Sequence, residues 1–348
     1  MISISMFNNK GGVGKTTLTC NIASYFAKVE NKRVLVVDCD PQCNATQLIM
    51  GEEFATDFYW NSPGGSNITT IRDVLQPIEE GDSHISESIK PILGSKSRFG
   101  VDLLPGHPGF SIVEDRLGAA WHDLLGGDIG GIRKSNWNAV LCARIADQYD
   151  FVFFDLGPSL GSINRCVLIG CDHFLTPMGT DIFSILGVKN IASWIDHWLD
   201  LYEKSVALCE QRNPGRLKEY GISELPLIRS GYLGYTMQQY ITKSKQGVRR
   251  ATVAYENIIK MVPDEIDKSL GKYFAKGIEI GDAKLGDVPH LYSLIPLAQS
   301  VAAPILDLRS GDGLVGSQYK NRDDYEKIIR SICFHLSENI GFAQKGIK

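Results

Sequence analysis

A glycine-rich segment near the start of the sequence carries two lysines and two threonines, which are residue types that can bind phosphate. Glycines let backbone N–H groups approach phosphate oxygens, a lysine can reach the β- and γ-phosphates, and a hydroxyl can bind Mg²⁺. In this pattern Lys15 is the phosphate-binding lysine and Thr16 is the metal-binding hydroxyl. We therefore predict a P-loop nucleotide site formed by Lys10, Gly11, Gly12, Val13, Gly14, Lys15, Thr16 and Thr17.

This loop differs in two positions from the usual Gly-x-x-x-x-Gly-Lys-Thr pattern. Asn9 stands where the first glycine is expected, and Lys10 is a second lysine before the glycine pair. The simplest interpretation is that the side chain of Lys10 is solvated. A second cation beside the phosphates would, however, help to neutralise charge during phosphoryl transfer. A helix that opens at Thr16 would add partial positive charge at the same place.

Three aspartates end two apolar segments. Asp38 and Asp40 follow residues 33–37, and Asp155 closes residues 151–154. A βαβ unit brings the end of its second strand beside the phosphates, and carboxylates two residues apart project to the same side. We expect one of the first pair to help hold hydrated Mg²⁺ and the other to orient water, with Asp155 also at the metal. Acids that cap the following turn are the alternative.

Short apolar segments alternating with helical stretches must position these residues. A helical stripe between the first two segments consists of Leu18, Ile22, Tyr25, Phe26 and Val29. The expected strands are Ile2–Phe7, Arg33–Val37, Val101–Leu104, Phe151–Phe154, His173–Pro177, Leu225–Gly231 and His290–Ile295. Consecutive apolar positions are typical of parallel strands covered on both faces, and the alternation implies right-handed crossovers. The sequence predicts an α/β fold with a doubly wound, mostly parallel sheet flanked by helices.

Other segments predict loops or a further helix. Residues 56–67 and 81–100 are rich in Gly, Ser, Pro and Asp and read as surface loops. Residues 126–135 hold four glycines and indicate a mobile connection. A second helical stripe, for which we favour core packing over a partner surface, consists of Trp194, Ile195, Trp198, Leu199 and Tyr202.

Composition excludes several classes of protein. No segment of the 348 residues approaches the roughly 18–20 uncharged apolar residues that span a bilayer, and strand-like alternation from the second residue leaves no room for a signal peptide. The net charge of −4 is not that of a globally basic nucleic-acid binder, so any such contact must use a local patch. The eight cysteines contain no C-x-x-C pair, and we interpret them as reduced apolar fillers in a cytoplasmic protein.

The motifs together resemble the deviant Walker A ATPases of the ParA/MinD group. Residues 10–17, 38–46 and 153–160 carry the resemblance, and the string Asp-Pro-Gln-x-Asn-Ala-Thr is closest to ParA. Weaker similarity, found at residues 70–75, 101–105, 175–188 and 303–316, extends it over most of the chain. The resemblance implies one P-loop NTPase domain over residues 1–348, with insertions around 106–150 and 196–290. Only seven residues precede Asn8, so no N-terminal helix-turn-helix is expected.

The resemblance also implies roles for the site residues. ATP binding would bring two copies face to face, with Lys10 reaching the phosphates of the opposite subunit. Lys15 and Thr16 would hold the phosphates and Mg²⁺, Asp40 would position the attacking water, and the metal would be supported by Asp38 and Asp155. Hydrolysis would be slow and stimulated by a ParB-like or other partner. The chain has Leu-Gly-Pro after Asp155 where the family often has Ala-Pro-Pro, so its switch behaviour is expected to differ.

A local basic patch could serve DNA. Residues 243–250 carry four positive charges and no acid, from Lys243, Lys245, Arg249 and Arg250. A solvated helix face or loop is the alternative interpretation. In a ParA-like ATPase that partitions plasmid or chromosome cargo, two copies of this patch would bind the DNA backbone without regard to sequence.

Three other functions remain open. A MinD-like membrane switch needs an amphipathic C-terminal helix, whereas residues 341–348 are short and contain two glycines, so stable membrane insertion is not expected. An electron-transfer ATPase similar to nitrogenase iron protein needs cluster cysteines, for which Cys166 and Cys171 are the only nearby pair. The chain could also gate an effector in a multi-gene system such as phage defence.

Overall fold

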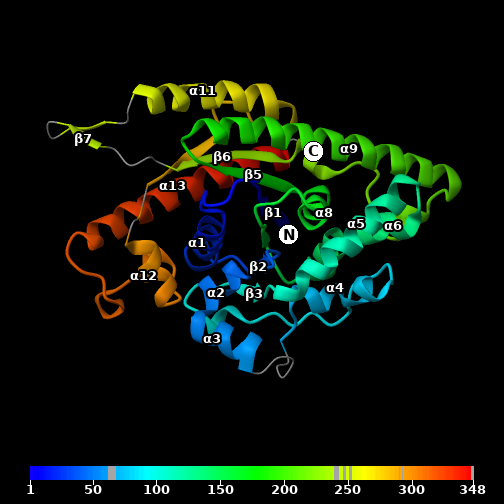
Figure 1. Ribbon diagram of the computed structural model, residues 1–348, viewed down its shortest axis with the longest axis horizontal. Helices are drawn as coiled ribbons and strands as arrows, with labels where there is room; N and C mark the ends of the chain where they lie inside the picture. Colours follow the sequence, from blue (N-terminus) through cyan, green and yellow to red (C-terminus); the bar gives the residue numbers. More distant parts are fainter. Residues whose placement is uncertain are drawn as a thin grey trace.

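The computed structural model describes residues 1–61, 68–238, 243–245, 248–250, 253–289, 291 and 293–345. A seven-stranded sheet runs through the molecule with helices on both faces (Figure 1). In spatial order its strands are β3 (Asp102–Leu104), β2 (Val34–Asp38), β4 (Phe151–Asp155), β1 (Ile2–Met6), β5 (His173–Met178), β6 (Tyr232–Gln238) and β9 (Lys284–Val288). Every neighbouring pair is parallel. The predicted doubly wound α/β fold is confirmed.

The side chains of each strand belong alternately to two separate hydrophobic cores, because successive side chains of a strand point to opposite faces of the sheet. In β2, Val34 and Val36 pack on one face while Leu35 and Val37 pack on the other. The first face is covered by α1 (Lys15–Lys28), α2 (Asn44–Met50), α12 (Leu294–Ser300) and α13 (Gln318–Lys345). The second is covered by α4 (Ile71–Glu80), α5 (Ser111–Leu125), α6 (Ile129–Ser135), α7 (Trp137–Ile145), α8 (Ser162–Gly170), α9 (Ile182–Arg212) and α11 (Val253–Leu270).

Short elements complete the described chain. They are α3 (Glu52–Thr56), α10 (Arg216–Glu219), a π-helix at Asp57–Asn61, and 3₁₀ turns at Gly94–Lys96, Pro108–Phe110, Leu227–Ser230, Gly271–Tyr273, Ile305–Asp307 and Ser310–Asp312. The predicted loop at 81–100 is confirmed apart from one of these turns, whereas the loop predicted at 56–67 begins with helix and its residues 62–67 lie outside the described part. Residues 341–345 of the C-terminal segment belong to α13, whose Ile340 and Ala343 are buried in the first core, and residues 346–348 lie outside the described part.

The last two predicted strands are wrong. The segment Leu225–Gly231 contains a 3₁₀ turn, and β6 starts only at Tyr232. Pro226 enters this turn with its fixed φ of −62°, and Leu225 and Leu227, on which the prediction relied, are 61% and 58% exposed. In the segment 290–295, residues 290 and 292 lie outside the described part, and α12 begins at Leu294; the strand lies earlier, at Lys284–Val288.

The glycine-rich segment 126–135 is a short turn followed by helix α6, and not a mobile connection. The carboxylate of Asp128 accepts a hydrogen bond of 2.7 Å from the backbone N–H of Gly131 and so starts α6. A Cβ on Gly131 would lie 2.5 Å from the backbone nitrogen of Leu124 in α5. The glycine therefore allows close packing of two helices.

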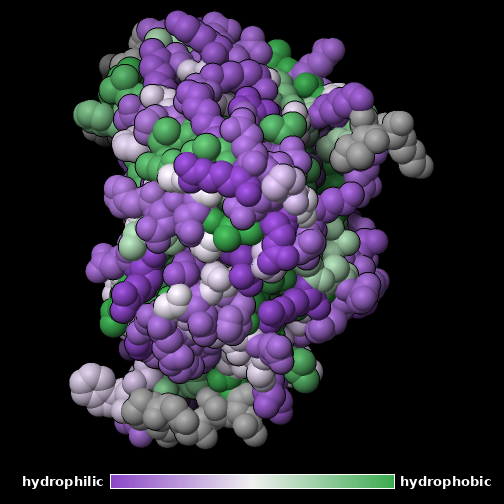
Figure 2. Space-filling view, turned by 90° about the vertical axis from the view of Figure 1, so that its right-hand side faces the viewer, coloured by the Kyte–Doolittle hydropathy of each residue, from purple (hydrophilic) through white to green (hydrophobic). Residues whose placement is uncertain are grey.

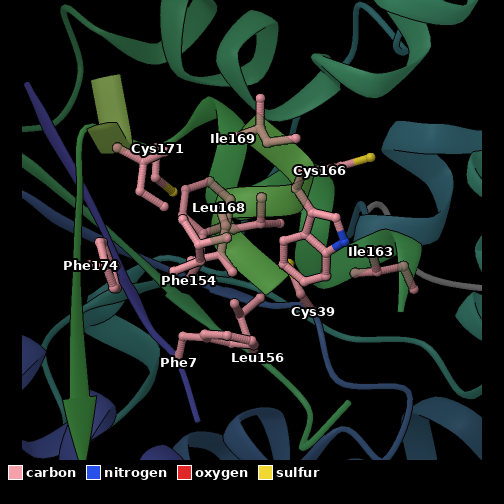
Figure 3. Packing of buried hydrophobic residues seen from close by; sticks show 14 of the residues in the cluster. Phe7, Cys39, Phe154, Leu156, Ile163, Cys166, Leu168, Ile169, Cys171 and Phe174 are labelled. Carbon is pink, nitrogen blue, oxygen red and sulfur yellow. The ribbon is translucent and has the colours of Figure 1, made fainter. Parts of the chain in front are cut away.

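The cysteines lie in the interior, as predicted. All eight are buried and unpaired. Figure 3 shows Cys39, Cys166 and Cys171 among apolar side chains such as Phe154 and Leu168. The apolar stripe of α9 is also buried, except for Trp194, which is 42% exposed.

Among the helices of the residues that the structure describes, none combines the length and apolar character needed to cross a bilayer.

One face of the molecule is shown by hydropathy in Figure 2. This face, at the right of Figure 1 where α9 ends beside α5 and α6, is mostly hydrophilic with small hydrophobic patches.

Candidate nucleotide site

The P-loop lies between the end of β1 and the start of α1, at the carboxyl edge of the sheet. Gly12 and Gly14 have φ angles of 73° and 77°, a region that glycine adopts without strain. A Cβ added to Gly11 or Gly12 would meet no atom within 4 Å, so there is open space beside these two glycines. The helix α1 begins at Lys15 and directs its free N–H groups toward this space. The loop therefore has the form of an anion cradle.

A cavity of about 720 Å³ opens in front of this loop. Seven of the predicted site residues line it, namely Gly11, Gly12, Gly14, Lys15, Thr16, Thr17 and Asp40. Lys15 is largely buried, and its ammonium group donates a hydrogen bond of 3.0 Å to the backbone oxygen of Lys10. The neighbouring loop contributes Leu156 and Pro158, and α12 contributes Pro296. Residues far apart in the sequence thus surround one space, whose volume is in the range of small-molecule binding sites.

The three predicted aspartates converge, but they occupy different depths. Asp38 and Asp155 are paired across β2 and β4 and are fully buried behind the cavity wall. Asp155 accepts a hydrogen bond of 2.8 Å from the hydroxyl of Thr16. Asp40 lines the cavity itself, and its Oδ1 accepts a hydrogen bond of 3.0 Å from the backbone N–H of Gln42.

Burial shifts the pKa values of three ionisable groups in this cluster. Burial raises the pKa of Asp155, and the nearby Asp38 carboxyl raises it further. Burial also raises the pKa of Asp38, although Thr46 donates two hydrogen bonds to its carboxylate, at 2.7 and 2.8 Å. Burial lowers the pKa of Lys15, against the attraction of Asp155 and Asp40. Because two carboxyls are buried close together beside a single ammonium group, binding of a further cation at this site is favoured.

A magnesium ion bound with a nucleotide fits this donor set. In the described residues, no group of three or more His, Cys, Asp or Glu side chains is arranged to hold a metal by itself. Mg²⁺ does not need such a group, because it keeps several waters and uses one or two protein oxygens together with substrate phosphates. The hydroxyl of Thr16 at the cavity wall, with Asp155 behind it, supplies that kind of site.

The predicted catalytic Lys10 is placed differently. Its ammonium group pairs with the carboxylate of Asp181, at the start of α9, and lies 3.4 Å from the hydroxyl of Ser184. It is not among the residues that line the cavity. In this structure Lys10 therefore contacts its own chain at the rim of the site.

A second recess adjoins the P-loop, and the sequence did not predict it. Its volume is about 290 Å³, and it shares Gly12, Gly14 and Thr17 with the first cavity. Its other walls come from Val13, Leu18, Thr236, Gln238, Val288, Pro289, Leu291, Ile295 and Tyr325. Strand β6, the end of β9 and the residues just after β9 form one side, so the errors in predicting these strands hid the recess.

Sequence reasoning also missed the residues that hold the aspartates in place. Thr46 fixes Asp38 and in turn accepts a hydrogen bond of 2.9 Å from the N–H of Gly106, after β3. A Cβ on Gly157 would lie 3.3 Å from the Asp40 carboxyl, so the glycine leaves room for that side chain. Both residues lie within the motifs quoted above, but only the three-dimensional contacts assign them these roles.

The predicted DNA patch falls on a hairpin. Strands β7 (Lys243–Lys245) and β8 (Val248–Arg250) form an antiparallel pair that aligns Lys243 with Arg250 and Ser244 with Arg249. This pair is separate from the seven-stranded sheet. Residues 246 and 247, and the side chains of Lys243, Lys245, Arg249 and Arg250, lie outside the described part of the structure.

Comparison with known proteins adds independent information. A family model described as an AAA domain matches residues 1–208. The virulence plasmid ParA family protein pGP5-D of Chlamydia psittaci is 28% identical over 262 residues, which are 74% of this chain and 89% of that protein.

Two solved structures are similar in fold. Protein DIP2308 from Corynebacterium diphtheriae has a TM-score of 0.70 and 36% identity, covering 87% of this chain and 97% of its own. The ATP complex of a McdA variant from Cyanothece has a TM-score of 0.58 and 13% identity, covering 98% and 96%, and shows the fold alone.

Proposed function

Because the chain belongs to the AAA domain family and is a P-loop ATPase of the ParA type, we propose that it is a cytoplasmic ATP-dependent dimerising switch. It binds DNA non-specifically in the ATP-bound form and positions plasmid or chromosome cargo, and a ParB-like or other partner resets it by stimulating slow hydrolysis. The observation that carries this proposal is the convergence of Lys15, Thr16 and Asp40 on one cavity.

The nucleotide would be held by its phosphates and by its base. Lys15 and the P-loop N–H groups face the space for the β- and γ-phosphates, and Thr16 offers its hydroxyl to Mg²⁺. When bound, the ion neutralises charge on the phosphates. The second recess suits a purine, because Val288, Pro289 and Ile295 supply apolar walls beside the amide of Gln238. Its position next to Thr17 supports a nucleotide as ligand in preference to a free phosphate.

Asp40 activates the attacking water. Its carboxylate lines the cavity, and the N–H of Gln42 fixes one of its oxygens. A carboxylate held in this way can orient a water molecule and accept its proton. Asp38 and Asp155 lie behind the wall, where Asp155 accepts the hydrogen bond of Thr16 and both carboxyls support the metal rather than the water.

Replacing Lys10 with alanine tests the proposed dimer. Lys10 does not line the cavity of its own chain, so we expect the Lys10→Ala monomer to bind nucleotide almost as tightly as the wild type. Loss of the cation that acts across the interface should abolish ATP-dependent dimerisation and hydrolysis. Sedimentation with and without ATP measures the first, and phosphate release measures the second. Lys32→Ala, at an exposed lysine, is the control. A Lys10→Ala protein that dimerises with ATP like the wild type would refute the role in trans.

Charge reversal on the hairpin tests DNA binding. We expect Arg249→Glu/Arg250→Glu to weaken ATP-dependent binding to every DNA sequence while leaving ATP binding unchanged. Affinity for DNA falls with salt at a log–log slope of about −0.9 per phosphate contact, so the variant should also have a flatter slope. Arg216→Glu/Lys218→Glu makes the same charge change on exposed residues of α10. Normal DNA binding by the hairpin variant at all salt concentrations would exclude this patch.

A further inference from the structure

The side chain of Asn164, in the first turn of α8, holds the loop that follows β4 (residues 156–161). Its amide nitrogen donates hydrogen bonds of 2.8 Å to the backbone oxygens of Gly157 and Ser159, and it lies 3.2 Å from the Ser159 hydroxyl oxygen. Asn164 is only 2% exposed, whereas Pro158 and Ser159 lie at the surface. Because hydrogen bonds fix this buried amide, the exposed loop takes its position from α8.

The same loop lies directly beside the Asp40 carboxyl. A Cβ on Gly157 would be 3.3 Å from both Cγ and Oδ1 of Asp40, so the backbone of this glycine packs against the carboxyl group. Asp40 also borders open space, because it lines both the nucleotide cavity and a neighbouring recess of about 310 Å³. Packing on all sides therefore does not fix the carboxylate. Its position depends on the N–H of Gln42 and on the loop.

A carboxylate from another helix holds the start of α8 in turn. This helix has Gly161 at its N-cap and no side-chain cap of its own. Both oxygens of Glu114, in α5, accept hydrogen bonds from backbone N–H groups of the first turn, one from Ser162 and one of 3.1 Å from Ile163. A Cβ on Gly161 would overlap Oε1 of Glu114, so the glycine makes room for this contact. Helix α5, helix α8 and the loop thus form one connected support.

We propose that Asn164 is a positioning residue for ATP hydrolysis. It fixes the loop so that Gly157 keeps the Asp40 carboxylate where it orients the attacking water, and Glu114 supports it by fixing the start of α8. This role rests on the proposed function, in which Asp40 activates that water. In the described structure neither Asn164 nor Glu114 lines the nucleotide cavity, so both act through the loop and not by touching the nucleotide.

Substitutions of these residues should lower turnover and spare binding, because a misplacement of about 1 Å can cost roughly 10²-fold in rate. Asn164→Asp keeps the shape of the side chain but replaces the donor with an oxygen that repels the two carbonyl groups. We expect turnover to fall roughly 10- to 100-fold, with ATP affinity within about threefold of the wild type, since the P-loop keeps its contacts. Glu114→Gln keeps one acceptor oxygen of two, so we expect a smaller loss of roughly three- to tenfold.

Single-turnover phosphate release and calorimetric titration with ATP and Mg²⁺ measure the two quantities, and circular dichroism checks the fold. The matched control is Asn339→Asp in α13. Asn339 is also 2% exposed, and its amide donates hydrogen bonds of 2.8 and 3.0 Å to the backbone oxygens of Leu233 and Asp282. The control should leave turnover within about threefold of the wild type. If it slows turnover as much as Asn164→Asp does, or if Asn164→Asp loses ATP affinity as much as turnover, the effect is general destabilisation and the positioning role is refuted.

A double-mutant cycle tests whether Asn164 acts through Asp40. In the Asp40→Asn protein the water-orienting charge is already absent, so adding Asn164→Asp should change the remaining turnover by less than about twofold. A further loss as large as in the wild-type background would show that Asn164 acts independently of Asp40 and would overturn the proposal. Should Asn164→Asp not fold, the same cycle is run with Glu114→Gln.

Failure of the positioning role can be told apart from failure of the proposed function. Wild-type turnover in Asn164→Asp together with slow turnover in Asp40→Asn would overturn the positioning role alone. Wild-type turnover in Asp40→Asn would show that Asp40 does not activate the water, and the positioning role would fall with it. A natural chain that does not hydrolyse ATP at all would overturn both.

Discussion

Replacing Lys15 with alanine is expected to abolish nucleotide binding. The ammonium group is largely buried at the cavity wall and faces two aspartates, so its loss removes the cation that phosphates need and leaves the acidic groups unbalanced. Removing one partner of a buried charge pair costs about 3–5 kcal/mol, which corresponds to a loss of roughly 150- to 4,000-fold in affinity. Calorimetric titration with ATP and ADP in the presence of Mg²⁺ measures the effect.

The control for Lys15→Ala lies in the same helix. Lys28 is in the last turn of α1 and pairs with Asp307, away from the cavity. Lys28→Ala should bind nucleotide with wild-type affinity, and circular dichroism should show that both variants are folded. If Lys15→Ala binds ATP as the wild type does, the cavity described above is not the nucleotide site.

Replacing Asp40 with alanine is expected to separate binding from turnover. The phosphate cradle stays intact because, in the described structure, neither Lys10 nor Lys15 forms a hydrogen bond or ion pair with Asp40, so ATP affinity should remain within about threefold of the wild type. Loss of a general base or water-orienting group lowers the rate roughly 10²- to 10⁴-fold. Bound ATP should then persist unhydrolysed, and with it the dimer. Single-turnover phosphate release, with and without a stimulating partner, is the measurement.

A second substitution separates the charge of Asp40 from its shape. Asp40→Asn keeps the oxygen that accepts a hydrogen bond from the N–H of Gln42, so the loop should keep its conformation. We expect this variant to be as slow as Asp40→Ala. Turnover equal to that of the wild type in either variant would move the water-activating role to Asp38 or another group.

The central strands and the P-loop could be predicted because their signals are local. Strands such as β2 and β4 are buried on both faces and therefore read as unbroken apolar segments. The later strands, β6 and β9, could not be predicted from the local sequence, because contacts with the rest of the fold determine their structure. Leu225 and Leu227 look like strand residues but are exposed on either side of Pro226, while β6 mixes tyrosine, threonine and glycine and is buried all the same.

The candidate site was predictable in its residue types and less so in its contacts. Parallel strands end at one edge of the sheet, so Asp38, Asp40 and Asp155 had to lie near the P-loop. The pairing of Lys10 with Asp181 joins residues 171 positions apart and depends on how α9 packs beside the loop. The apolar recess likewise needs residues from β6, β9 and α13 together. Neither the Lys10–Asp181 ion pair nor the recess can be recognised from a pattern in the local sequence.

The buried cysteines have a practical consequence for studying these conformational changes. Burial raises the thiol pKa of every cysteine, including Cys39 and Cys171 in the core, and a thiol reacts with alkylating reagents only as its anion and only when accessible. The natural chain should therefore react slowly with maleimide dyes. A cysteine introduced at an exposed position, for example Trp194→Cys in α9, would then be the single fast-reacting thiol. Fluorophore pairs or spin labels attached there could follow subunit association in real time, without first removing the eight natural cysteines.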